Sequence, residues 1–71
     1  MPIVMAPTNT PVTVIKILTE DKVKKHLENL GITIGSTVTV LSEEGGSVIL
    51  LVKEGRLALD KNLATKILVR I

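Results

Sequence analysis

The stretch Leu30–Leu41, with the sequence LGITIGSTVTVL, restricts the fold of this 71-residue chain more than any other. It follows an amphipathic segment, and Gly31 stands where a helix would end with one residue in the left-handed conformation. Gly35 provides a second turn, after which Val38 and Val40 alternate with threonines, as in a half-buried strand. The stretch therefore predicts the end of a helix, a sharp corner and the start of a strand.

The segment before this corner predicts the helix itself. Val23, Leu27 and Leu30 are spaced four and three residues apart, so that they form one narrow apolar stripe along a helix. Thr19 is the expected N-cap, and the two acidic residues after it lie where the helix dipole favours negative charge. Beyond the helix, Ile32 and Ile34 are expected to anchor the exit of the chain.

Five short segments are predicted as strands because they are rich in β-branched residues or are bounded by turn residues. They are Val12–Leu18, Thr37–Leu41, Val48–Lys53, Arg56–Leu59 and Ile67–Ile71. Strict alternation in the first strand would place Lys16 and Leu18 on the same face as Val12. Its opposite face is also largely apolar, so a helix is expected to cover it.

The connections between the later strands are short. Glu43–Ser47 is predicted as a hairpin loop in which Gly45 and Gly46 take positive φ angles. Glu54–Gly55 is predicted as a second tight turn. Asp60 is the expected cap of a single helical turn that runs to Ala64.

The predicted order is β, α, β, β, β, short α, β, which is typical of a small, mainly β, partly open SH3-like barrel. One domain is expected over residues 1–71, with an irregular and largely extended N-terminal arm over residues 1–11, where three prolines occur. The chain has no Cys and no aromatic residue, so its core must be aliphatic and no disulfide can support it.

Composition also limits the partners. A net charge of +2 with both signs interspersed does not favour nucleic-acid binding, and the missing aromatics remove the usual stacking platform for single strands. No apolar run approaches the ~20 residues of a membrane span, so the protein is not expected to be membrane-inserted. The N-terminus lacks the pattern of a secretory signal, which predicts a cytoplasmic protein. The residues leave the oligomeric state open, with a monomer as the expected form.

Few residues suggest chemistry. His26 is the only histidine, and the helix offers it no second ligand one turn away, so an exposed side chain is the favoured interpretation. Glu43 and Glu44 are adjacent in a turn and would point to opposite sides, which leaves weak ferrous binding there only as an alternative. No nucleophile has a base at local spacing. An enzyme is therefore not expected, nor is a cofactor.

Three cations, Lys22, Lys24 and Lys25, cluster on the predicted helix. The favoured interpretation is a solvated helix face. The alternative is a contact for an acidic protein surface, since exposed charge of one sign attracts a partner of the opposite sign.

From Leu27 to Ile71 the sequence resembles the FeoA family, the small cytoplasmic component of bacterial ferrous iron uptake. The resemblance rests on the order and spacing of several pieces: Leu30-Gly31-Ile32, Gly35, Val38-x-Val40, Gly45-Gly46, the strand Val48–Val52, Arg56-Leu57-Ala58-Leu59, and Ala64-x-x-Ile67-x-Val69. These residues are turn glycines and core aliphatics in the main, so the resemblance indicates fold more strongly than mechanism.

The resemblance implies an SH3-like barrel and an accessory protein that acts by contact on FeoB, a membrane iron permease with a cytosolic GTPase domain. The N-terminal segment differs from the family's usual Leu-rich start. An alternative follows from the same resemblance, because the C-terminal domain of iron-dependent repressors is similar; the chain would then be a regulatory domain. Direct metal carriage is disfavoured by the missing ligand set.

Overall fold

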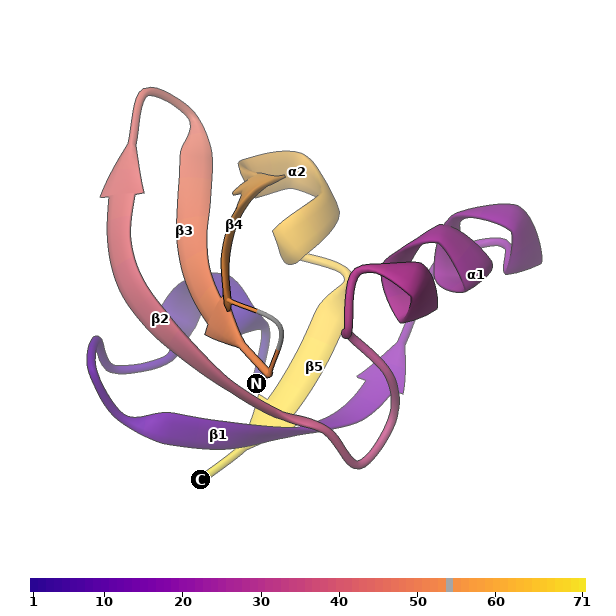
Figure 1. The fold of residues 1–71 in the computed structure, drawn as a ribbon, viewed down its shortest axis with the longest axis horizontal. Coiled ribbons are helices and arrows are strands. Elements are labelled where there is room, and N and C mark those ends of the chain that lie inside the picture. Colours follow the sequence, from indigo (N-terminus) through magenta and orange to yellow (C-terminus); the bar gives the residue numbers. More distant parts are fainter. Residues whose placement is uncertain (54) are drawn as a thin grey trace.

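The computed structural model describes residues 1–53 and 55–71, and within them the chain folds into one curved antiparallel sheet with two α-helices and a 3-10 helix (Figure 1). The strands are β1 Pro11–Ile17, β2 Thr37–Glu44, β3 Ser47–Val52, β4 Gly55–Asp60 and β5 Ile67–Arg70. The helices are η1 Ile3–Met5, α1 Asp21–Asn29 and α2 Lys61–Ala64. Of the turn expected at Glu54–Gly55, Glu54 lies outside the described residues.

The strand order β4-β3-β2-β1-β5 confirms the predicted fold class of a partly open, SH3-like barrel. Aliphatic side chains from every strand turn inward and are almost completely buried, with no buried charged residue among those described. The core includes Val12, Val14, Val38, Val40, Val48, Leu50, Leu59, Ile67 and Val69. The predicted alternation of β2 is confirmed, because its valines are buried while Thr37 is exposed.

The first strand departs from its predicted alternation. Its register with β5 shifts between Val14 and Lys16, which is a β-bulge at Ile15. The extra residue reverses the faces beyond it, so Ile17 is buried at 4% exposure while Leu18 is 50% exposed. Ile15 itself is 43% exposed. The expectation that a helix covers the outer face of this strand is therefore wrong.

The hairpin between β2 and β3 is tighter than predicted. Glu43 pairs with Val48 and Glu44 with Ser47, so both glutamates belong to β2 and not to a loop. Only two glycines form the turn, with φ angles of 54° and 83°. Two successive positive φ angles are the pattern of a type I′ turn, whose twist matches that of the strands it joins.

Helix α1 begins one residue later than expected. Its N-cap is Glu20, without a side-chain cap, and the hydroxyl of Thr19 is buried with no hydrogen-bond partner among the described residues. The C-terminal end follows the prediction, because Gly31 has a φ angle of 95°. The N–H of Ile32 donates to the carbonyl of Leu27 at 2.9 Å, and the N–H of Gly31 to that of Glu28 at 3.0 Å. This pair of bonds is a Schellman motif.

The N-terminal arm lies against β5. Residues 3–5 form a 3-10 turn, so the extended geometry expected there is wrong. Ile3 is completely buried, and Pro2 bridges Leu68. The N–H of Val69 donates to the carbonyl of Met1 at 2.7 Å. The arm thus covers backbone groups that the open edge of β5 would otherwise expose.

Two aliphatic residues lie outside the positions predicted for them. Ile34, expected to anchor the helix exit, is 60% exposed, because only Ile32 faces the core there. Ile71 lies beyond the end of β5 and is 73% exposed. The cap of α2 is as predicted: the carboxylate of Asp60 accepts from the N–H groups of Asn62 and Leu63 at 3.0 and 3.3 Å.

Candidate functional site

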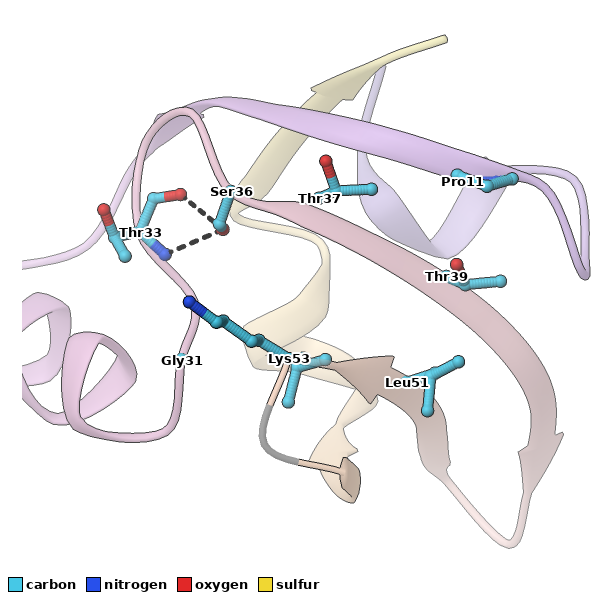
Figure 2. A pocket seen from close by; sticks show the side chains of 9 residues that line it. Pro11, Gly31, Thr33, Ser36, Thr37, Thr39, Leu51 and Lys53 are labelled. Carbon is cyan, nitrogen blue, oxygen red and sulfur yellow. Dashed lines mark hydrogen bonds between the residues drawn. The ribbon is translucent and has the colours of Figure 1, made fainter.

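A groove of about 610 Å³ runs over the outer face of the sheet along the first half of β2 (Figure 2). Three strands and the α1–β2 connection contribute to it. It is lined by Pro11, Gly31, Thr33, Ser36, Thr37, Thr39, Leu51, Val52 and Lys53.

Strand pairing explains the hollow. Pro11 of β1 lies opposite Thr39 of β2, which in turn lies opposite Leu51 of β3. Directly opposed residues of an antiparallel pair share one face of the sheet. The short threonine therefore lies between two larger apolar side chains, which form the walls of the groove.

The loop Thr33–Ser36 closes one end of the groove. The hydroxyl of Ser36 donates to the carbonyl of Thr33 at 2.6 Å and accepts from its N–H at 3.1 Å, as the dashed lines in Figure 2 show. The N–H of Gly35 also donates to the carbonyl of Val14 at 2.8 Å. This end of the groove is thus fixed to β1 by the backbone, and its shape does not depend on long side chains.

The lining is apolar with polar groups at defined places. Leu51 is 43% exposed although it is a large aliphatic residue in the middle of a strand. The side chain of Lys53 extends from the end of β3 towards the loop that carries Thr33 (Figure 2). Among the described residues, the lining includes hydroxyls and one cation but no acidic residue. Such a surface can bind an apolar group next to a negative one.

A smaller hollow of about 200 Å³ lies next to this groove, between the C-terminal end of α1 and the start of β4. It shares Val52 with the groove and is lined otherwise by Asn29, Leu30, Gly55, Arg56 and Leu57. The exposed guanidinium of Arg56 adds a second cation on this side of the barrel.

The cluster of cations on α1 lies apart from the groove lining. Lys22 and Lys25 are exposed, while Lys24 is half-buried. Helix α1 extends sideways from the barrel, with its N-terminal turn farthest from the sheet (Figure 1). The three lysines are therefore presented on a projecting element. Their role as a partner contact stays a prediction.

The residues considered for metal binding are not brought together. His26 is exposed on α1. The carboxylate of Glu43 forms an ion pair of 2.7 Å with Lys61, and that of Glu44 accepts from the hydroxyl of Ser42 at 3.1 Å. Within residues 1–53 and 55–71, no group of three or more His, Cys, Asp or Glu residues could hold a metal ion. The same residues contain no helix long and apolar enough to cross a membrane.

The residues that carried the family resemblance have distinct positions. Leu30, Gly31 and Gly35 form the corner beside the two hollows, and Gly45 with Gly46 forms the hairpin turn. Ala64 is completely buried under the sheet, whereas Ala58 is exposed on β4.

Sequence reasoning did not identify the groove. A signal for it exists in the sequence, because Thr37, Thr39 and Leu51 all fall at outward positions of alternating strands. Lys53 and Pro11 lie beside these residues only because β1 pairs with β2 and β2 pairs with β3. No local sequence pattern reveals this pairing.

The family model that describes the FeoA domain matches residues 1–71. The chain is similar to a solved structure described as the iron uptake regulatory protein FeoA, with 31% identity, a TM-score of 0.87, and coverage of 99% of this chain and 95% of that one. None of the curated proteins matches it.

Two further solved structures share the fold. The FeoA-like protein from Clostridium acetobutylicum is 26% identical, with a TM-score of 0.84 and coverage of 100% of this chain and 85% of that one. The FeoA protein from Chlorobium tepidum is 23% identical, with a TM-score of 0.90, and the match covers 100% of this chain and 70% of that one.

Proposed function

Because this chain belongs to the FeoA family, which is tied to ferrous iron transport, we propose that it is a non-enzymatic accessory protein of bacterial ferrous iron uptake. It acts in the cytoplasm by contact with the cytosolic face of an FeoB-type membrane permease, whose GTPase domain it can thereby modulate. The observation that carries the proposal is the match of the family model over the whole chain, residues 1–71.

The surface of the protein supports action by contact. The groove is open to solvent, has apolar walls on paired strands, and presents a leucine that is 43% exposed. Exposed apolar surface with a polar rim is typical of protein-binding sites. The cations Lys22, Lys24 and Lys25 provide a second feature, since complementary charge speeds the encounter with an acidic partner.

A titration of the isotope-labelled protein with the cytosolic domain of the permease tests this proposal. We expect amide shifts that cluster on one face, and no comparable shifts in a parallel sample with ferrous iron alone. Shifts with iron alone, centred on His26 or on Glu43 and Glu44, would instead make this a metal-binding protein. The GTP hydrolysis rate of the same domain, with and without this chain, measures the modulation.

Charge reversal tests whether the lysine cluster of α1 takes part in docking. We expect the triple change Lys22→Glu, Lys24→Glu, Lys25→Glu to weaken docking on the permease domain without unfolding the protein. A matched control reverses three exposed cations near β1 and β5, namely Lys16, Lys66 and Arg70, with the same change in net charge. Equal affinity of the two triple variants would show that the lysine face of α1 is only solvated.

One observation favours a second candidate function. The 31% identical relative is described as an iron uptake regulatory protein. A regulatory domain similar to the C-terminal domain of iron-dependent repressors would also fit that description. Deletion of the gene distinguishes the two: loss of ferrous uptake supports the accessory protein, whereas altered transcription with intact uptake supports the regulatory domain.

A further inference from the structure

We propose that the groove over β2 binds an extended segment of the partner protein in which an apolar residue and an acidic residue are separated by one residue. This inference rests on the proposed function, because it identifies the chemistry of the segment that the same docking protein would bind. Three features of the groove carry it: the spacing of its hydroxyls, the exposed leucine of its wall, and the cation Lys53 at its end.

The hydroxyls of Thr37 and Thr39 indicate an extended ligand. Both line the groove, and neither side chain makes a hydrogen bond to any other described residue. They are two positions apart on one face of a strand, which corresponds to about 6.6–6.8 Å. An extended peptide that lies along β2 repeats its own same-side groups at this interval, so both hydroxyls can bond to it in register.

The wall formed by β3 sets the side-chain pattern. Leu51 of β3 is 43% exposed and offers an apolar contact, and Lys53, the first residue after the end of this strand, follows it two positions later. Because this interval again equals that of alternate residues in an extended chain, the complementary ligand has an apolar side chain facing Leu51 and a carboxylate facing Lys53.

The charge of the site selects an acidic group over a basic one. Lys53 is exposed, and the described residues that line the groove include no carboxylate. The neighbouring hollow adds the cation Arg56 on the same side of the barrel. A lysine or arginine in the ligand would therefore meet the like charge of Lys53 at this end of the groove.

Two matched peptides test the chemistry directly. Each has seven residues of serine and threonine, except for leucine at its third position and, at its fifth, glutamate in one peptide and lysine in the other. In titrations of the labelled protein, we expect shifts of Thr37, Thr39 and Leu51 and a preference of about two- to fivefold for the glutamate peptide, which is the size of one exposed charge pair.

Variants of the protein test whether this preference depends on Lys53 and Leu51. Lys53→Glu should reverse it, whereas Lys66→Glu, a charge change of the same size at an exposed residue just before β5, should leave it unchanged. Leu51→Ser should weaken both peptides by about tenfold, because it removes most of the apolar contact. The melting curves of all three variants show whether the fold is kept. If Leu51→Ser does not fold, the peptide preference of Lys53→Glu tests the inference by itself.

Equal binding of the two peptides would overturn the inference, as would amide shifts that lie outside the groove. Groove shifts that depend on the concentration of this protein alone would also overturn it, because they would mean that a second copy occupies the groove. Titration with the permease domain separates the two proposals. Binding that Lys53→Glu and Leu51→Ser leave unchanged would support the proposed function and refute the groove. Selective peptide binding without binding of the permease domain would refute the proposed function and keep the groove.

Discussion

The two α-helices of this protein are attached to the barrel in opposite ways. Helix α1 has nine residues, but only Leu27 among them is fully buried, and its first turn lacks a side-chain cap. Helix α2 has four residues, begins with the carboxylate cap of Asp60, and ends at the fully buried Ala64. The longer helix therefore depends on its C-terminal end for attachment, whereas the shorter one is a fixed corner between β4 and β5.

This difference indicates which kind of partner recognition the surface of α1 and the groove can each provide. A projecting helix presents Lys22 and Lys25 to solvent, and Leu27 is the residue of this helix that is fully buried against the barrel. The groove is built on paired strands and on a hydrogen-bonded loop, so its groups keep fixed spacings. Long-range charge attraction suits the first surface, and selection by shape suits the second.

The largest effect is expected when the single buried anchor of α1 is removed. Leu27→Ala should lower the free energy of unfolding by about 2–4 kcal/mol, because it leaves a cavity between the helix and the core. Denaturant unfolding measures this loss. Loss of amide protection confined to residues 21–29, with the barrel still protected, would show that the helix detaches by itself; a uniform loss would show that helix and barrel form one cooperative unit.

The second-largest loss of stability is expected at the junction between α1 and the barrel. Gly31→Val should destabilise by more than ~1 kcal/mol, because the residue has a φ angle of 95° that a β-branched side chain adopts only with strain. A new Cβ would lie 3.6 Å from Cγ2 of Val52, which is an ordinary contact, so strain rather than collision is the cause. Gly31→Ala should therefore retain most of the effect. A melting curve close to that of the wild type would contradict the Schellman assignment.

The caps of the two helices can be compared directly, because α2 has a side-chain cap at Asp60 and α1 has none at Glu20. Asp60→Ala should cost about 1 kcal/mol, since it removes the acceptor for two backbone N–H groups at the start of α2. Asp60→Asn keeps an accepting oxygen and should cost much less. Glu20→Ala, at the uncapped start of α1, should change the unfolding free energy little. Equal effects of Asp60→Ala and Glu20→Ala would remove the distinction between the two helices.

The sequence was sufficient to predict most of the helices, strands and turns because the signals for them are local. The apolar stripe of α1, the glycine at its end, the cap at Asp60 and the glycine hairpin each depend on residues close together in the chain. The bulge at Ile15 could not be predicted, because it results from how β1 fits against β5. The groove depends in the same way on strand register, so the candidate site was missed although the residues that form its corner were identified.

The smallest change in the free energy of unfolding is expected at Thr19, and the sign of this change shows whether its hydroxyl caps the helix. If Thr19 capped α1, Thr19→Val would cost about 1 kcal/mol. The structure instead places its hydroxyl oxygen in a buried position with no hydrogen-bond partner among the described residues, and the N-cap is Glu20. Valine has nearly the same shape without the buried polar group, so the substitution should stabilise the protein by up to about 1 kcal/mol. Thr19→Ser, which keeps the hydroxyl and loses the methyl group, should not stabilise it. Denaturant unfolding of the two variants side by side measures the sign, and destabilisation by valine would mean that this hydroxyl does cap the helix in solution.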